Sequence, residues 1–138
     1  MRKVMVFGTF DGVHAGHRAF LREASHHGDY LIVVVAPNHV AEHLKGKKPV
    51  SDIADRLEEL RSEDGVSEVV VGDSELGTWE VIQLYHPDVI ALGYDQKELL
   101  KSLESHLETA RRRPEIVIMS AHEPDKYHSN IIRNGEKV

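Results

Sequence analysis

The chain has 138 residues, which is enough for one domain with a substantial hydrophobic core and too few for two ordinary domains. Hydrophobic residues make up 41% and charged residues 29%, a balance that is typical of folded soluble proteins and argues against intrinsic disorder. The net charge of -6 argues against a nucleic-acid-binding surface, the absence of cysteine excludes disulfides and thiolate chemistry, and no apolar run could span a membrane, so we expect a cytoplasmic protein.

Short runs rich in valine and isoleucine alternate along the chain with longer stretches of helical period. In chain order we expect strand 4–7, helix 16–27, strand 30–35, helix 52–63, strand 68–71, helix 78–85, strand 89–92, helix 97–112 and strand 116–119. Ser51 is the expected N-cap of the second helix, and residues 37–50 are expected to form a mobile loop. A short last helix is expected to begin near residues 128–130.

The expected strands mostly lack polar alternation, as strands buried on both faces do. Their alternation with helices predicts an α/β fold in a single domain: a Rossmann-like, doubly wound, mainly parallel five-stranded sheet with helices on both faces. In such sheets ligands bind at the carboxyl ends of the strands, near the point where the strand order reverses. The segment after the first expected strand is therefore a candidate site.

That segment, GTFDGVHAGH at residues 8–17, places two histidines three residues apart around a glycine. A helix N-terminus has unsatisfied N–H groups and a partial positive charge, so it favours phosphate. Gly16 lets the backbone approach a ligand, and His14 and His17 can both donate hydrogen bonds to one anion. These residues predict a site that gathers donors around a phosphate during its transfer. From the residues alone, a histidine helix cap with turn glycines is the alternative.

The ten residues GTFDGVHAGH resemble the signature of the cytidylyltransferase-like (HxGH) superfamily of nucleotidyltransferases. These enzymes transfer a nucleoside monophosphate from a nucleoside triphosphate to a phosphorylated acceptor and release pyrophosphate. Along its whole length the chain is similar to the small members, the glycerol-3-phosphate cytidylyltransferases and the archaeal-type FAD synthases. The FAD synthases are the better match at three places, which are Lys45-Gly46-Lys47-Lys48-Pro49, Arg56 and Leu92-Gly93-Tyr94-Asp95-Gln96.

The resemblance implies a reaction and a role for each matching residue. The implied reaction is AMP transfer from ATP to FMN; CTP with glycerol-3-phosphate comes second, and a sugar phosphate acceptor third. His14, His17 and Lys45 would be the catalytic residues, stabilising the phosphoryl group in transfer. The nucleotide would be bound by Gly8, Thr9, Phe10, Gly16, Arg56, Gly93, Tyr94, Asp95, Gln96, His128, Ser129 and Asn130.

Three of these assignments have alternatives or departures. Arg56 could instead be a surface helix arginine paired with a nearby acid, and residues 93–96 could form a simple β-turn. Asn130 stands where the family has a small hydroxyl residue, which leaves the number of hydroxyl contacts to pyrophosphate open, although asparagine is a good helix cap.

The resemblance also implies magnesium and a homodimer. Magnesium would arrive with the nucleoside triphosphate, held chiefly by phosphate oxygens and water, so no protein metal site is expected. Two other classes remain open. A metal-binding protein is one, because the ten histidines include His39 and His43 one helical turn apart and the pair His26-His27. A nucleotide-binding regulatory module without turnover is the other, since the departure at Asn130 allows it.

Overall fold

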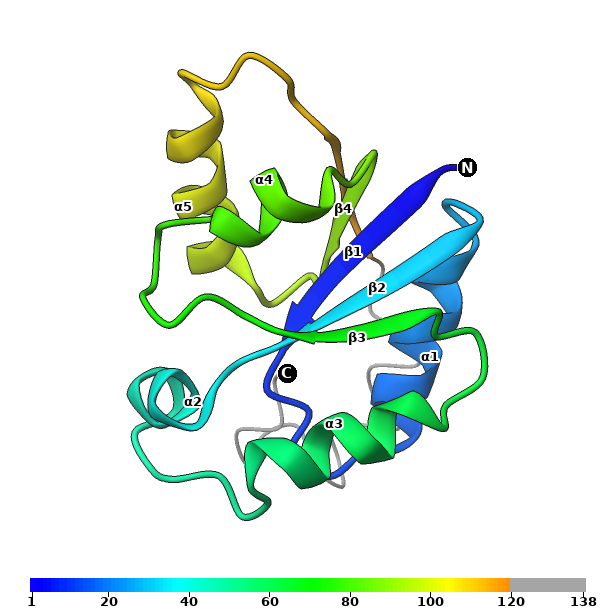
Figure 1. Cartoon of the computed structure of the whole chain (residues 1–138), viewed down its shortest axis with the longest axis vertical. Helices are drawn as coiled ribbons and strands as arrows, with labels where there is room; N and C mark the ends of the chain where they lie inside the picture. The colour runs from blue at the N-terminus through cyan, green and yellow to red at the C-terminus, as the bar shows by residue number, and fades with distance from the viewer. Residues whose placement is uncertain (120–138) are drawn as a thin grey trace.

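The computed structural model describes residues 1–119 and shows a sheet between two layers of helices (Figure 1). The elements in chain order are β1 (Lys3–Gly8), α1 (Ala15–Ser25), β2 (Tyr30–Val35), α2 (Asn38–Lys45), α3 (Ile53–Arg61), β3 (Glu68–Val71), α4 (Glu80–Tyr85), β4 (Val89–Leu92), α5 (Lys97–Leu107) and β5 (Glu115–Ile118). Every strand and helix predicted within this range is present. Only the end of α5 is far from its predicted position, because the residues after Leu107 are largely exposed and have no apolar face to bury. No helix among these residues is long and apolar enough to cross a membrane.

The five strands are all parallel, in the order β3-β2-β1-β4-β5. The prediction of a doubly wound parallel sheet is therefore confirmed. From β1 the chain adds β2 and β3 on one side, then returns to place β4 and β5 on the other. The order thus reverses between β1 and β4, which is where such sheets bind ligands. Residues 8–17 follow the first of these strands and residues 93–96 the second.

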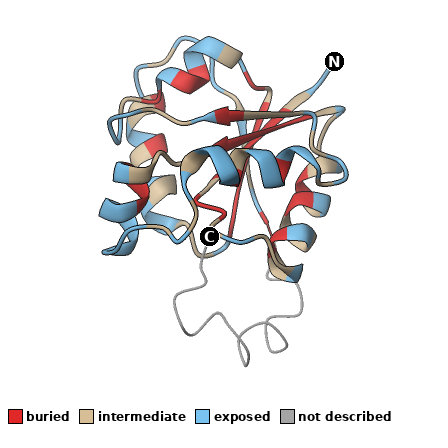
Figure 2. Cartoon of the chain, turned by 60° about the horizontal axis from the view of Figure 1, so that its bottom comes forward, coloured by how far each residue is buried: buried red, intermediate tan, exposed pale blue. Residues whose placement is uncertain are grey.

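The strands are buried because helices cover both faces of the sheet (Figure 2). On one face, alternate strand residues such as Val4 and Val6 pack with Leu21 of α1 and Leu60 of α3. The other face packs against α4 and α5, and the residues from these helices include Val81, Ile82, Leu103 and Leu107. Full burial of each such side chain stabilises the fold by about 1.5–3 kcal/mol.

The prediction of a mobile loop at 37–50 is wrong for residues 38–45, which form α2. Its start and stop signals are Pro37 at the N-cap and Gly46 at the C-cap, where φ is 79° and the N–H bonds to the Glu42 carbonyl at 2.8 Å. Val40 and Ala41 are buried and hold the helix to the domain. Such a short helix depends on this packing, so its sequence alone carries a weak signal.

The expected N-cap at Ser51 is also wrong. Asp52 caps α3, and its Oδ2 atom accepts a hydrogen bond from the Ala54 N–H at 3.4 Å. The Ser51 N–H and carbonyl are instead bonded to Asp11 and Arg56, which commits the residue to the loop before the helix.

Candidate active site

The first turn of α1 is closed by two histidines that cap each other's backbone. His14 is the N-cap, and its Nδ1 atom accepts a hydrogen bond from the Gly16 N–H at 3.1 Å. In return, the His17 Nδ1 atom accepts one from the His14 N–H at 3.3 Å. A serine or threonine with a glutamate usually forms this capping box. Because each Nδ1 atom accepts, each neutral ring carries its proton on Nε2.

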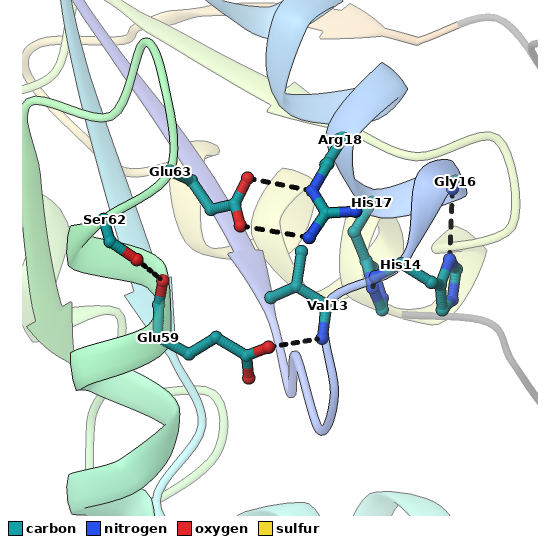
Figure 3. A network of polar contacts seen from close by, with 8 residues as sticks. All are labelled: Val13, His14, Gly16, His17, Arg18, Glu59, Ser62 and Glu63. Carbon is teal, nitrogen blue, oxygen red and sulfur yellow. Dashed lines mark hydrogen bonds and ion pairs between the residues drawn. The ribbon is translucent and has the colours of Figure 1, made fainter.

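The two imidazole rings stack at the N-terminus of α1 (Figure 3). Their centroids are 3.9 Å apart and their planes differ by 27°. The N–H groups and the positive end of the dipole of α1 lie at the same place. The structure therefore brings the two predicted phosphate-binding side chains together at the N-terminus of α1, where the Gly16 N–H bonds to His14.

His17 is a buried ring, 6% exposed, and it packs against Phe10 with 5.3 Å between the ring centroids. Burial, helped by the charges of His14 and Lys45, lowers the pKa of His17 from 6.5 to about 3 against an opposing hydrogen bond with the Gly12 backbone. The ring is therefore neutral at pH 7 without a ligand. A phosphate beside it would raise the pKa again, because a negative charge favours the imidazolium form.

The chain folds back sharply between β1 and α1, at Phe10. Its φ of 52° is a left-handed conformation, which costs an aromatic residue about 1–2 kcal/mol. This turn places the Phe10 ring against Gly8, where a Cβ would lie 2.7 Å from Phe10 Cε2. Glycine is thus required at residue 8. The buried Phe10 ring supports His17, so only the backbone of this residue could line a nucleotide.

Two carboxylates, Glu59 of α3 and Glu63 just after that helix, bind residues at the start of α1 (Figure 3). Glu59 Oε2 accepts a hydrogen bond from the Val13 N–H at 3.4 Å, and Glu63 Oε1 forms an ion pair with Arg18 Nε at 3.1 Å. The hydrogen bond and charge of Glu63 raise the pKa of Arg18. Because the arginine is half exposed, this pair contributes little to stability. The two contacts connect the start of α1 to the end of α3 and the residues after it.

The turn after β4 lies close to α1 and to the end of β1. Gln96 Oε1 accepts a hydrogen bond from the Gly93 N–H at 2.7 Å, and Gln96 Nε2 donates to the Phe7 carbonyl at 2.9 Å. A Cβ at Gly93 would lie 3.6 Å from Phe20 Cε1 of α1, so the turn is close to that helix. One amide side chain therefore ties the end of β4 to the end of β1, where the strand order reverses.

The tip of the same turn carries Tyr94 and Asp95. The Gln96 N–H bonds to the Gly93 carbonyl at 3.0 Å, so residues 93–96 do form a β-turn. Tyr94 is 37% exposed, and burial of its ring together with the Asp95 charge raises the pKa of its hydroxyl. A β-turn is compatible with contacts to base or ribose, and nucleotide binding by these residues stays a prediction.

Lys45 of α2 lies close enough to His17 for its charge to act on that ring. It is the last residue of α2, and its charge helps to lower the pKa of His17. The structure thus brings the three predicted catalytic residues into one electrostatic neighbourhood. It places Lys45 at the end of a folded helix and not on a mobile loop.

Arg56 lies beneath the site and not on the surface. Its side chain is 0% exposed, and the guanidinium donates to four neutral oxygens: the Thr9 carbonyl at 2.8 Å, the Ala36 carbonyl at 2.8 Å, Asn38 Oδ1 at 2.7 Å and the Ser51 carbonyl at 3.1 Å. The alternative of an exposed arginine paired with an acid is therefore wrong. Direct contact of Arg56 with the nucleotide stays a prediction.

An apolar pocket of about 270 Å³ lies on the other side of the same strand ends. Three candidate nucleotide-binding residues, Gly8, Thr9 and Gln96, line it too. Most of its wall is apolar and includes Phe7, Val40, Leu44, Leu76, Trp79 and Leu99. An apolar cavity of about 150 Å³ is enough for benzene, so this pocket can hold a larger ring system.

Trp79 fixes one wall of this pocket. It packs edge to face against Phe7 with 5.3 Å between centroids, and its Nε1 atom donates to Ser102 Oγ at 3.1 Å. It precedes α4 with a left-handed φ of 53°, and its indole, which has a donor and no acceptor, cannot cap the helix. Asp73 does so instead, by accepting hydrogen bonds from the N–H groups of Glu80 and Val81.

The residues of the apolar pocket wall and Asp11 had no role predicted from the sequence. Asp11 accepts hydrogen bonds from the N–H groups of Val50 and Ser51 at 2.6 and 2.8 Å, which ties the segment after α2 to the segment after β1. The only sequence signal for Asp11 was its place inside the motif. The pocket residues come from separate elements, and no local pattern in the sequence connects them.

Three predicted nucleotide-binding residues, His128, Ser129 and Asn130, lie outside the described residues. Within residues 1–119, no group of three or more His, Cys, Asp or Glu side chains is placed to hold a metal ion. His39, one of the histidines considered as a metal ligand, instead has its Nε2 atom 2.7 Å from the Ser74 carbonyl oxygen.

A family model and similar curated proteins point to the same family of nucleotidyltransferases. The model of the family described as cytidylyltransferase-like matches residues 5–135. The FAD synthase of Thermococcus sibiricus is 32% identical over 136 residues, covering 99% of this chain and 89% of that protein. The FAD synthase of Pyrococcus abyssi is 38% identical over 115 residues, covering 83% and 78%.

Solved structures have the same fold. A lipopolysaccharide core biosynthesis protein from Thermoplasma volcanium superposes with a TM-score of 0.82 at 33% identity, over 89% of this chain and 99% of that one. Pantoate-beta-alanine ligase from Francisella tularensis superposes with a TM-score of 0.61 at 12% identity, over 86% and 58%. At that identity the second likeness shows the fold alone.

The lowered pKa of His17 predicts a pH dependence of stability. Between its ordinary pKa of 6.5 and the folded value of about 3, the unfolded chain binds a proton that the folded chain does not. As the pH is lowered from 6.5 towards 3, this group alone should therefore reduce the free energy of unfolding by about 1.4 kcal/mol per pH unit. Below pH 3 the effect should level off, because both states then bind the proton. The measurement is urea unfolding of the wild type and of His17→Gln at pH 7, 6, 5 and 4. The free energy of unfolding of the wild type should fall relative to that of His17→Gln as the pH is lowered. A difference that does not change with pH would contradict the lowered pKa of His17.

Proposed function

Because the chain belongs to the cytidylyltransferase-like family of nucleotidyltransferases, we propose that it transfers the adenylyl group of ATP to FMN, making FAD and pyrophosphate. One observation carries the proposal: the stacked histidine pair follows β1, and a largely apolar pocket lined by Gly8, Thr9 and Gln96 lies on the other side of the ends of β1 and β4. This arrangement suits a reaction between a triphosphate and a phosphorylated ring compound.

The reaction joins two phosphates and needs no protein nucleophile. A phosphate oxygen of FMN attacks the α-phosphorus of ATP, the bond from that phosphorus to the β-bridging oxygen breaks, and pyrophosphate leaves. With a second pKa of about 6, the FMN phosphate is largely deprotonated at pH 7, so a general base would add little. The protein's task is to position the two substrates and to stabilise charge.

His14 and His17 perform that stabilisation at the α-phosphoryl group. Their Nε2–H donors and the N-terminus of α1 meet the oxygens on which negative charge grows. Because His17 is neutral and desolvated before binding, its hydrogen bond forms in a low-dielectric setting where it is strong. Lys45 adds the fixed positive charge from the end of α2.

The pocket supports FMN as the acceptor. An isoalloxazine ring is planar with an apolar dimethylbenzene end, and the wall formed by Phe7, Trp79 and Leu99 suits that end. Glycerol-3-phosphate has no ring to fill such a space, which favours FMN over it. A cytidylyl donor or a sugar phosphate acceptor remains the alternative.

Magnesium belongs to the nucleotide in this proposal. We propose an ion coordinated mainly by phosphate oxygens and water. The ion supplies charge neutralisation on the triphosphate. A homodimer in the cytoplasm stays a prediction from the sequence.

The reaction is tested by product mass. The purified protein with magnesium is incubated with ATP or CTP against FMN, glycerol-3-phosphate or a panel of sugar phosphates. We expect FAD and pyrophosphate from ATP with FMN. A cytidylylated product would select the alternative donor, and the absence of pyrophosphate from every pairing would favour a regulatory binding module.

Replacement of His17 should lower turnover with limited change in substrate binding. His17→Asn removes the Nε2–H donor at the reacting phosphate, and loss of one such donor costs about 100-fold in kcat. His26→Asn is the matched control, since His26 is the exposed C-cap at the other end of α1. Steady-state FAD formation measures both variants. Equal kcat in His17→Asn and the wild type would remove His17 from the chemistry.

Replacement of Leu76 should affect the acceptor and not the donor. Leu76→Glu removes part of the apolar wall and adds a negative charge, so we expect the KM for FMN to rise by about tenfold with the KM for ATP nearly unchanged, which corresponds to about 1.4 kcal/mol. Leu84→Glu is the control, because Leu84 is also exposed but lies on α4 outside this pocket. An equal effect on both KM values would contradict the pocket assignment.

A further inference from the structure

The largest fully buried side chain of the described residues is a charged one, Arg56. Burying a guanidinium is costly unless its donors are satisfied. Four of its five N–H groups have a neutral oxygen as acceptor, and Asp11 and Asp52 favour its charged form, against the burial that lowers its pKa. An apolar side chain could fill the same space without the free-energy cost of burying a charge. Packing alone therefore does not explain why an arginine stands at residue 56.

The acceptors of Arg56 have a pattern. Asn38 is the first residue of α2 and Ser51 lies just before α3, so the guanidinium holds both ends of the segment 38–51. Its Nη1 atom meanwhile bonds to the carbonyls of Thr9 and Ala36, which directly follow β1 and β2. One planar group thus fastens the base of segment 38–51 to the strand ends at the site.

Neighbouring side chains reinforce the same attachment. Asn38 Nδ2 donates to Asp52 Oδ1 at 2.7 Å, which orients the amide oxygen towards Arg56. Asp11 binds the N–H groups of Val50 and Ser51. Segment 38–51 is therefore held at its two ends, and it carries Lys45 between them.

We propose that Arg56 is a positioning residue: by clamping the two ends of segment 38–51 to the carbonyls after β1 and β2, it sets the place of Lys45 opposite the histidine pair. The inference rests on the proposed function in that Lys45 is taken to act in nucleotidyl transfer. Lys45 lies about 10 Å along α2 from Asn38, so a change of helix direction at Asn38 moves the ammonium group. In this proposal Arg56 acts through Lys45, in place of the direct nucleotide contact that the resemblance implied.

Lysine cannot replace this clamp. Its single ammonium is a point donor, whereas the guanidinium fork reaches four separated oxygens at once. Arg56→Lys keeps the charge and most of the volume, so it isolates the geometry. The matched control is Arg61→Lys, on the exposed end of the same helix.

The first experiment is a double-mutant cycle on kcat for FAD formation. We expect Arg56→Lys to lower kcat on the order of tenfold in the wild-type background and less than about twofold when Lys45→Ala is already present, because the two residues act through one another. Lys101→Ala replaces Lys45→Ala as the control background. If the loss from Arg56→Lys is the same in both backgrounds, Arg56 acts independently of Lys45, by nucleotide contact or by general stability, and the proposal is wrong.

The second experiment needs no activity. Backbone hydrogen exchange in Arg56→Lys should accelerate by about tenfold or more in residues 38–51, while β1, β2 and β4 keep wild-type protection. Unchanged exchange in 38–51, or equal acceleration throughout the sheet, would overturn the clamp. Asn38→Ala, which keeps the guanidinium and removes one acceptor, should show the same selective pattern and serves if Arg56→Lys does not fold. If the clamp is found but no FAD forms, the proposed function fails and the clamp stands.

Discussion

The parallel pairing of β1 with β2 on one side and β4 on the other is the constraint on which the site depends. It brings three strand ends to one edge, so that residues far apart in sequence meet there. Side chains then fix the chain where it leaves the strands: Gln96 donates a hydrogen bond to the carbonyl of Phe7, and Arg56 donates to those of Thr9 and Ala36. Without this shared edge, the segments that surround the histidine pair and the pocket would not come together.

The alternation of side chains along β1 divides the site into two halves. Val4 and Val6 face α1 and α3, and the chain leaving on that side forms the polar N-terminus with its two histidines. Met5 and Phe7 face α4 and α5, and the Phe7 ring begins the apolar pocket. Phosphate donors and an apolar wall thus lie on opposite sides of one strand end, which is the geometry that joining a phosphate to a ring-bearing acceptor requires.

The sequence sufficed for the parts of the structure that are locally encoded. Buried valine-rich runs specify the strands, and the motif around His14 and His17 specifies a strand-to-helix junction with its donors. The sequence did not reveal α2, because an eight-residue helix depends on burial of Val40 and Ala41 against the rest of the domain. The sequence pointed to Arg56 as a site residue but not to its burial, since its four acceptors come from separate segments that only tertiary structure joins.

The net negative charge of the chain explains why the positions of a few donor groups matter for binding. A protein with a net charge of -6 has no broad positive field to attract a triphosphate, so recognition has to come from short-range donors. Short-range hydrogen bonds weaken steeply with misplacement and reward preorganisation. His17 is held neutral and buried against Phe10, and Lys45 stands at the end of a helix whose base is fastened. A costly buried guanidinium is then understandable as support for a site whose binding energy depends on where a few donors point.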